Sequence, residues 1–288
     1  MASLIKDVFP YIGSISVKDI RPKQIIEIAR KIEEREVYET CHRTIGRIRE
    51  VFDFAIINEY CENNPATSIP KVLKPVIHGH FAAITEPIKL RPIIRKIFSY
   101  HGVNPIVNIL IRLGPLTFQR PSELRMAKWK DIDLDHSEWR YFVTKTKVEH
   151  IVPLNRQAVL LLNELKTLTG SGINLFPSSK DKNRFISNNA IRAAYASLEI
   201  DTSNEHTEHG WRATARTILD EVLHFPELAL EFQLSHTNQK DRNKGAYSRA
   251  KYLDVRKQAM QAWGDYIETL ATTDTKLDSI ARKLKYKP

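Results

Sequence analysis

Apolar residues recur at helical spacing through the first quarter of the chain. The segment RPKQIIEIARKIEERE places four apolar side chains on one helix face, and Pro22 suits the first helical turn. A second helix is predicted from Tyr38 to Tyr60 with a similar stripe. Pro65, in ENNPA, ends this pattern because proline disfavours helical geometry at the residue before it. Residues 1–75 are therefore predicted to form one helical domain.

The pattern breaks after residue 70, where PKVLKPVIHGHFAAITEP carries three prolines and one glycine without clear periodicity. We interpret residues 76–87 as an interdomain linker. Helical patterning returns at Ile88, and NPIVNILIRLGPL is apolar enough for a buried helix. A second domain is therefore predicted over residues 88–268.

Short β-type runs lie in the middle of this second domain. WKDIDLD, EWRYFVTKTK and EHIVPL are of this kind, and the last two predict a hairpin. From RQAVLLLNELKTL onward the pattern is again mostly helical. The predicted fold class is mainly α in two domains, the second of which contains a small antiparallel β-sheet. Residues 269–288 are polar and basic, and we expect them to form a mobile tail.

Charge narrows the range of partners. The chain has 44 basic and 34 acidic side chains, which gives a formal net charge of +10. This balance favours a polyanionic partner, either nucleic acid or an anionic membrane surface. No apolar run approaches the roughly 18 residues of a membrane span, and the N-terminus lacks the apolar core of a signal peptide. Only Cys41 and Cys61 occur, too few for a disulfide framework, so we expect a reducing, cytoplasmic setting.

Two basic candidates for chemistry lie before and within the predicted hairpin. Arg120 precedes Pro121 at a predicted helix start, where Glu123 could hold Arg120 or cap its own helix. The simpler alternative is an ordinary surface arginine. In VTKTKVEHIVPL, Lys145 and Lys147 share one side of a strand by its two-residue period. Either lysine could reach a phosphate or a leaving group, although exposed hairpin lysines usually do neither.

A third candidate is the segment EHTEHGWRATARTIL. His209 and Arg212 are three residues apart, which predicts that both lie on one helix face. A guanidinium beside an imidazole donor suits a phosphoryl group. His206 with His209 invites a metal-site hypothesis, but HEXXH is absent and no Asp, Glu or Cys cluster completes such a site. We therefore predict no metal and no cofactor.

The fourth candidate is LSHTNQKDRNKGAYSRAKYL, which contains His236, Tyr247 and Tyr252. A tyrosine is a poor nucleophile unless nearby cations favour its phenolate. The simpler alternative is a basic surface helix whose tyrosines do no chemistry.

The order of these residue types is more specific than any one of them. Arginine, lysine, His-x-x-Arg, histidine and tyrosine follow one another between Arg120 and Tyr247, and each has a place in one reaction. Two arginines bind the non-bridging oxygens of a scissile DNA phosphate, and histidines supplement them. The lysine protonates the departing 5′-oxygen, while the tyrosine attacks phosphorus and becomes a 3′-phosphotyrosine.

These motifs resemble those of the tyrosine recombinases, in the subgroup of P4-like integrases that is typical of prophages and genomic islands. VFPYIGSISVKDIRPKQII and VFDFAIINEYCENNPA are similar to the core-binding domain of that subgroup. QRPSELRMAKWKDIDLD, KTKVEHIVPL, HGWRATARTIL, LSH and GAYSRAKYLDVRKQAMQAWGDYI are similar to its catalytic domain. The resemblance covers almost the whole chain and implies a site-specific recombinase that integrates or excises mobile DNA.

By position, the resemblance implies six catalytic residues: Arg120, Lys145, His209, Arg212, His236 and the nucleophile Tyr247. The family pattern selects Tyr247 because it lies in GAYSRA, and leaves Tyr252 to packing. The register K-x-K-x-x-H-I-V-P-L favours Lys145 over Lys147.

The resemblance also implies partners. We expect double-stranded DNA attachment sites, a homotetramer on paired sites with a monomer in the absence of DNA, accessory DNA-bending proteins and no membrane. The two domains would clamp the duplex, and the tail after about Ile267 would dock on a neighbouring protomer. Arg43 and Arg47, opposite the apolar stripe of their helix, would contact phosphates; the alternative is a solvated face. Such integrases usually open with an arm-binding domain, and we expect arm binding to be absent.

Two other functions stay open at this point. A type IB topoisomerase-like nicking and closing enzyme shares the chemistry without pairing two sites, and the P4-like first domain argues against it. A non-catalytic DNA-binding fragment is the second alternative, and the complete set of catalytic residue types argues against that.

Overall fold

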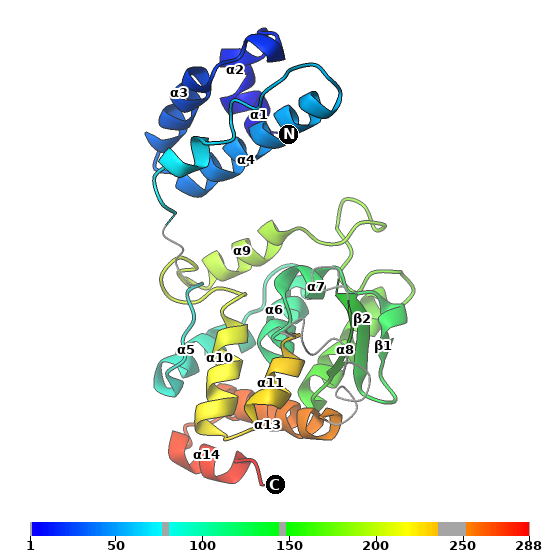
Figure 1. Cartoon of the computed structure of the whole chain (residues 1–288). Coiled ribbons are helices and arrows are strands. Elements are labelled where there is room, and N and C mark those ends of the chain that lie inside the picture. Colours follow the sequence, from blue (N-terminus) through cyan, green and yellow to red (C-terminus); the bar gives the residue numbers. More distant parts are fainter. Residues whose placement is uncertain (1, 77–80, 144–147, 236–251, 288) are drawn as a thin grey trace. The chain divides into compact units, whose positions relative to one another are not determined.

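The computed structural model describes two compact units, residues 1–80 and 81–288 (Figure 1). The residues that it describes are 2–76, 81–143, 148–235 and 252–287. Within these segments no helix is both long and apolar enough to cross a membrane.

The described part of the first unit is helical. Its elements are α1 (Ala2–Asp7), α2 (Phe9–Ile12), the 3-10 helix η1 (Val17–Asp19), α3 (Pro22–Glu33), α4 (Tyr38–Ile57) and the 3-10 helix η2 (Ile69–Val72). The apolar stripes predicted from the sequence form the core, in which Ile25, Ile28 and Ile45 are almost completely buried. Burial of these stripes holds α3 and α4 together.

The ends of the two long helices follow from local chemistry. Pro22 occupies the first position of α3, as predicted. The α4 helix ends at Ile57 rather than at the predicted Tyr60. Glu59 adopts a left-handed φ of 58°, which cannot continue a right-handed helix.

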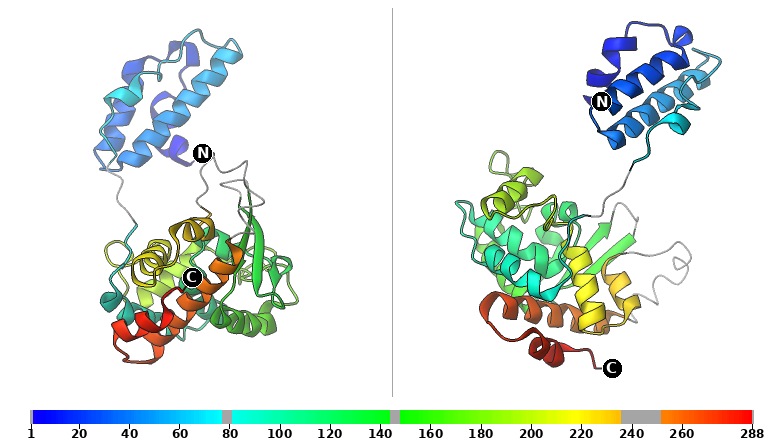
Figure 2. Two further views of the ribbon diagram at one scale, coloured as in Figure 1. Left: turned by 60° about the horizontal axis from the view of Figure 1, so that its bottom comes forward. Right: turned by 90° about the vertical axis from the view of Figure 1, so that its left-hand side faces the viewer.

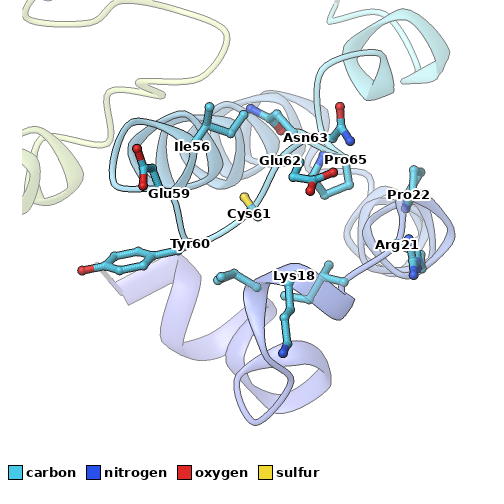
Figure 3. A pocket seen from close by; sticks show the side chains of 13 residues that line it. Lys18, Arg21, Pro22, Ile56, Glu59, Tyr60, Cys61, Glu62, Asn63 and Pro65 are labelled. Carbon is cyan, nitrogen blue, oxygen red and sulfur yellow. The ribbon is translucent and has the colours of Figure 1, made fainter.

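A hollow of about 880 Å³ lies beside the C-terminal end of α4 (Figure 3). Its lining includes basic and acidic side chains: Lys18, Arg21, Glu59 and Glu62. Mixed charges do not provide the single sign that a polyanion requires. All six predicted catalytic residues belong instead to the second unit, residues 81–288.

The second unit combines helices with one sheet. Its helices before the sheet are α5 (Pro87–Phe98), α6 (Pro105–Thr117), α7 (Pro121–Arg125) and the 3-10 helix η3 (Trp129–Asp131). Those after it are α8 (Arg156–Thr169), α9 (Asn188–Ser197), α10 (Trp211–Thr217), the π-helix η4 (Ile218–Val222), α11 (Glu227–Gln233), α13 (Leu253–Thr272) and α14 (Leu277–Leu284). This composition confirms the predicted mainly α class.

The sheet has the order β1-β2-β3 and is antiparallel throughout. Its strands are β1 (Ile132–Asp133), β2 (Glu138–Val143) and β3 (Val148–Pro153). Pairing of β2 with β3 runs from Glu138 opposite Pro153 to Val143 opposite Val148, which confirms the predicted hairpin. The alternation of side chains along β2 turns Trp139 and Val143 into the core.

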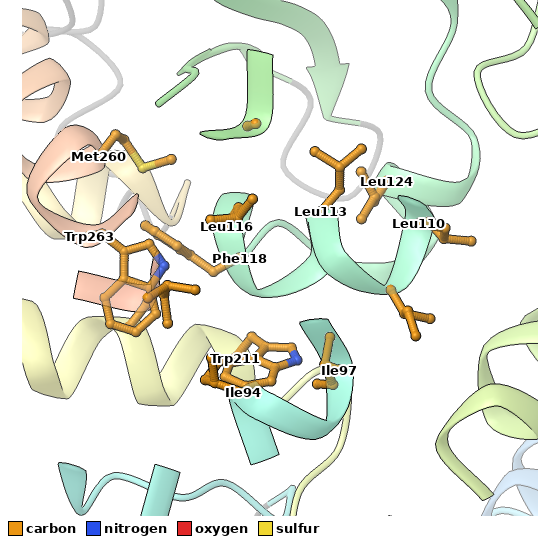
Figure 4. Close-up of a cluster of buried hydrophobic side chains, with 14 of the residues drawn as sticks. Ile94, Ile97, Leu110, Leu113, Leu116, Phe118, Leu124, Trp211, Met260 and Trp263 are labelled. Atoms are coloured by element: carbon orange, nitrogen blue, oxygen red, sulfur yellow. The ribbon is translucent and has the colours of Figure 1, made fainter. Parts of the chain in front are cut away.

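The core of the second unit surrounds α6, the helix that the sequence predicts to be buried (Figure 4). Leu110 and Leu116 of this helix are fully buried, together with Trp211 and Trp263. The indole Nε1 of Trp263 donates a hydrogen bond to the carbonyl of Pro115 at 2.7 Å. Helix α13 is thereby fastened to the end of α6 that leads into the candidate site.

Part of the predicted linker is fastened to the second unit. The Ala82 carbonyl accepts the backbone N–H of Thr207 at 2.8 Å, and the Ile84 carbonyl accepts the hydroxyl of Thr214 at 2.8 Å. Residues 82–84 therefore form an ordered edge of this unit.

The C-terminal tail differs from the expectation. Helix α13 runs through the predicted boundary at residue 268, and α14 packs alongside it (Figure 2). Ile280 is only 3% exposed, and the ring of Tyr286 lies 5.0 Å from that of Phe225 between centroids. The described part of the tail therefore forms a packed helix instead of the mobile segment that was predicted. The reason is that the apolar face of α14 finds its partner within the same chain. Docking of the tail on a neighbouring protomer stays a prediction.

Candidate active site

Arg120 is held at the start of a short helix by Glu123. Phe118 ends α6 with a left-handed φ of 40°, and Arg120 then caps α7 ahead of Pro121. Nη1 of Arg120 lies 2.9 Å from Oε1 of Glu123, and Oε2 of Glu123 accepts the Arg120 backbone N–H at 3.3 Å. Each of the two side chains is 14% exposed. Both roles predicted for Glu123, holding the arginine and capping the helix, are confirmed.

Arg212 lies on α10 and is almost completely buried. Its Nη1 donates to the carbonyl of Phe118 at 3.2 Å, and its Nη2 donates to the carbonyl of Leu234 at 2.6 Å. Burial, and then the positive charge of Arg120, lower the pKa of Arg212 to about 10. The guanidinium is therefore still charged at neutral pH. Carbonyl partners orient this charge without cancelling it.

His209 lies in the turn before α10 and not on the helix. Since α10 begins only after its N-cap Gly210, the prediction that His209 and Arg212 share a helix face is wrong. The backbone of Gly210 packs so closely that a Cβ there would lie 2.4 Å from the Ala82 carbonyl oxygen. The His209 ring packs against that of Phe81, with 4.3 Å between centroids and the two planes tilted by 45°. Contacts with a segment far away in sequence thus set the position of His209.

His206 is a packing residue. Its ring is fully buried, lies 4.0 Å from the Trp211 ring between centroids, and has its Nε2 3.1 Å from the hydroxyl of Thr214. Burial lowers the pKa of His206 to about 4, so the ring is neutral at pH 7. Among the described residues, no group of three His, Cys, Asp or Glu side chains could hold a metal ion.

Tyr141 belongs to the site although the sequence did not single it out. Its hydroxyl lies 2.8 Å from Oε2 of Glu123 and 3.1 Å from Oε1 of Gln119. Gln119 is buried. Strand alternation places Tyr141 on the same side as Trp139, on which it stacks with 4.5 Å between centroids. This alternation could have indicated from the sequence that Tyr141 faces the same side as Trp139. It does not show which helix lies opposite that side of the strand.

A second polar group that the sequence did not indicate joins three elements behind the site. Nε2 of His150, on β3, lies 3.1 Å from the carbonyl oxygen of Gln233, at the end of α11. Arg256, on α13, donates to Oε1 of Gln233 at 2.9 Å and also to the carbonyl of Ile151. Burial, followed by the charge of Arg256, lowers the pKa of His150 to about 3. These residues fasten the start of α13 to the end of α11.

Three of the predicted catalytic residues and one rival lie outside the described residues: Lys145, Lys147, His236 and Tyr247. Their predicted roles stay predictions. Tyr252 is described, and its ring stacks on Phe232 with 5.5 Å between centroids. The packing role predicted for Tyr252 is therefore confirmed.

Arg43 and Arg47 lie on the exposed side of α4, opposite its buried stripe. Arg43 forms an ion pair with Glu39 at 2.6 Å, and Arg47 donates to the hydroxyl of Ser3 at 2.6 Å. Their exposure matches the prediction, while their contact with DNA stays a prediction.

Comparison with known proteins gives a consistent result along the chain. A family model described as phage integrase central domain matches residues 1–72, and one described as phage integrase family matches residues 106–243. The integrase of Enterobacteria phage P4 is 31% identical over 91% of the chain, and prophage integrase IntZ of Escherichia coli (strain K12) is 34% identical over 93%. The chain spans 62% and 65%, respectively, of the length of these curated relatives.

Solved structures share the fold. A lambda integrase dimer bound to a COC′ core site superposes with a TM-score of 0.62 at 17% identity, and covers 88% of this chain and 87% of its own. The Tn1549 transposon integrase in complex with circular intermediate DNA gives a TM-score of 0.54 at 16% identity, with coverages of 87% and 89%. At these identities the likeness is one of architecture.

Proposed function

The chain belongs to the phage integrase family of tyrosine recombinases, and from this membership we propose that it is a site-specific DNA recombinase. It would cleave and rejoin DNA through a 3′-phosphotyrosine intermediate, and so integrate or excise a prophage or genomic island. A chromosomal substrate would place this activity in the bacterial cytoplasm.

The observation that supports this proposal most directly is the pairing of Arg120 with Arg212. Arg120 is the N-cap of α7, and Arg212 of α10 donates a hydrogen bond to the carbonyl of Phe118, two residues before Arg120. The charge of Arg120 contributes, after burial, to the lowered pKa of Arg212. Repulsion between two like charges is unfavourable; the Glu123 carboxylate beside Arg120 offsets it in this structure, and a bound anion would offset it further. A phosphodiester has one negative charge shared by two non-bridging oxygens, so it suits such a pair.

The remaining steps are assigned by position in the family pattern. The Tyr247 oxygen would attack the scissile phosphorus, forming the phosphotyrosine bond as the bond to the 5′-oxygen breaks. Lys145 would donate a proton to that departing oxygen. His209 and His236 would donate hydrogen bonds to the phosphate and manage the tyrosine proton. Reversal of these steps by a new 5′-hydroxyl would rejoin the strand.

The two units would divide the work. Residues 1–75 would form the core-type DNA-binding domain, residues 76–87 the linker, and residues 88–268 the catalytic domain. Arg43 and Arg47 are exposed and would contact phosphates.

The oligomeric state that we propose also rests on the similarity to other integrases. Lambda integrase is known as a dimer on a core site and as a tetramer on a Holliday junction. We propose that this chain also acts as a homotetramer on paired double-stranded attachment sites. Accessory DNA-bending proteins would assist it.

A nicked suicide duplex that carries the core attachment sequence of the mobile element tests the proposal. Because the nick lets the cleaved end diffuse away, the covalent adduct accumulates. We expect an adduct that forms in EDTA and disappears in Tyr247→Phe. An adduct that survives Tyr247→Phe but not Tyr252→Phe would contradict the choice of nucleophile. Strand exchange between two sites would separate a recombinase from a nicking and closing enzyme.

A further inference from the structure

Tyr141 is partly buried, and none of the six proposed catalytic roles uses its hydroxyl. Its ring stacks on Trp139, with 4.5 Å between centroids, and meets the edge of His150 at 5.6 Å. Both neighbours belong to the β2–β3 hairpin. The sheet therefore fixes where this hydroxyl lies.

Glu123 is the stronger of the two acceptors that face this hydroxyl. Oε2 of Glu123 lies at 2.8 Å and Oε1 of Gln119 at 3.1 Å. A hydroxyl has one proton to donate, and a carboxylate accepts it more strongly than an amide oxygen. Burial and the charge of Glu123 raise the pKa of Tyr141 above its ordinary range, so the proton stays on the hydroxyl.

Glu123 is thereby held at both of its oxygens. Oε1 accepts from the Arg120 guanidinium at 2.9 Å, while Oε2 accepts from Tyr141 and from the Arg120 backbone N–H. Rotation about the last side-chain bond of glutamate is soft. A bond at each oxygen therefore fixes the plane of the carboxylate, and with it the direction of the guanidinium.

We propose that Tyr141 is a positioning residue for DNA cleavage. By orienting Glu123 from the sheet, it sets the direction in which Arg120 presents its guanidinium to the scissile phosphate. This inference rests on the proposed recombinase function and deepens it.

Tyr141→Phe tests the inference because it removes the hydroxyl and leaves the ring. We expect the rate of adduct formation on the suicide duplex to fall about ten- to hundredfold, the range set by losing one charge-assisted hydrogen bond in the transition state. Affinity for intact duplex should stay unchanged. Tyr266→Phe is a matched control, since its buried hydroxyl has no hydrogen-bond partner among the described residues. The control should cleave at the wild-type rate.

A duplex whose scissile group is uncharged can show whether Tyr141→Phe slows cleavage by misplacing Arg120 or by a general structural defect. A methylphosphonate at the scissile position carries no negative charge for Arg120 to offset. The loss in Tyr141→Phe should therefore shrink on this duplex. It should also add little to the loss in Glu123→Gln, because both changes act through the same guanidinium. A folded Tyr141→Phe that cleaves at the wild-type rate, or shows an equal loss on both duplexes, would overturn the proposal.

A measurement that does not depend on DNA cleavage can test the role of Tyr141 separately from the proposed recombinase function. Nitrogen-15 NMR of the Arg120 guanidinium reports how freely it rotates. We expect hindered rotation in the wild type and faster rotation in Tyr141→Phe. Unchanged rotation would overturn the positioning role whether or not the chain cuts DNA. Faster rotation in a chain whose wild type forms no adduct would support the link between Tyr141 and Arg120 and overturn only the recombinase proposal.

Discussion

Among single residues, Arg212 connects the fold to the proposed chemistry most directly. It is 5% exposed, and backbone carbonyls of two different segments hold its guanidinium. Arg212→Ala should slow adduct formation at least about a hundredfold, the usual cost of losing one preorganised donor to a transition-state oxygen. Binding of intact duplex should change little, because many other phosphate contacts supply affinity.

Arg216→Ala is the matched control for this prediction. Arg216 lies one turn further along α10 and forms ion pairs with Asp220, Glu227 and Glu231. Its loss should leave cleavage unchanged. If Arg212→Ala loses folding together with cleavage, Arg212 is a folding residue and not a phosphate ligand.

His150 predicts how stability depends on pH. Its pKa in the folded protein is about 3, below the ordinary histidine value of about 6.5, so the unfolded chain binds a proton first as the pH falls. Its contribution to stability is complete above the ordinary value and is lost as the pH falls from there toward 3. The loss reaches at most about 1.4 kcal/mol per pH unit.

Urea unfolding between pH 6.5 and pH 4, a window within which His150 is still neutral in the folded protein, checks this expectation. His150→Gln keeps a donor for the Gln233 carbonyl but does not titrate, so the unfolding free energy should fall less steeply with decreasing pH. Exposed His101 offers a control, and His101→Gln should keep the wild-type slope. Equal slopes for the wild type and His150→Gln would show that His150 is not the group being protonated.

Among the elements, α14 makes a testable contact with its own chain. Ile280 is its buried residue, and exposed Ser279 lies beside it on the same helix. Ile280→Ala should weaken docking by about 2 kcal/mol or more, the usual cost of emptying an isoleucine site. Hydrogen exchange of residues 277–284 should then quicken about thirtyfold. Ser279→Ala should not change it, and unchanged exchange in Ile280→Ala would mean that α14 is not docked through this side chain.

Local sequence patterns predicted those helices and strands whose formation depends on residues that are close together in the sequence. The hairpin follows from alternation, the start of α3 from Pro22, and the buried α6 from its nearly continuous apolar run. Helix α14 was missed because its segment is mostly polar, although Leu277, Ile280 and Leu284 do recur at helical spacing.

The candidate site was predictable by residue type more than by geometry. The reach of Glu123 to Arg120 spans three residues and follows from helix-start chemistry. The position of His209 depends instead on Phe81 and Ala82, which are far away in sequence. The bond from Tyr141 to Glu123 joins a strand to a helix in the same way. Tertiary contacts of this kind cannot be inferred from spacing alone.

For DNA binding by the whole molecule, the positions of the exposed charged side chains matter more than the formal net charge of +10. Each unit has its own apolar core, so each can present a charged surface independently of the other. On α4 of the first unit, Arg47 and Arg49 are both exposed, but a separation of two residues turns them to different faces of the helix. Substituting each of these two arginines in turn can therefore distinguish the loss of a phosphate contact from a general effect of net charge.

Arg47→Ala should therefore lower the salt dependence of duplex binding, whereas Arg49→Ala, with the same change in net charge, should not. Each lost phosphate contact reduces the slope of log K against log salt concentration by about 0.9. Arg43 should contribute less than Arg47, because its ion pair with Glu39 must be disrupted first, while Arg47 leaves only a neutral serine hydroxyl. Fluorescence anisotropy of labelled duplex over a salt series measures these slopes. Equal slopes for Arg47→Ala and Arg49→Ala would identify this side of α4 as a solvated face, the simpler alternative for these arginines.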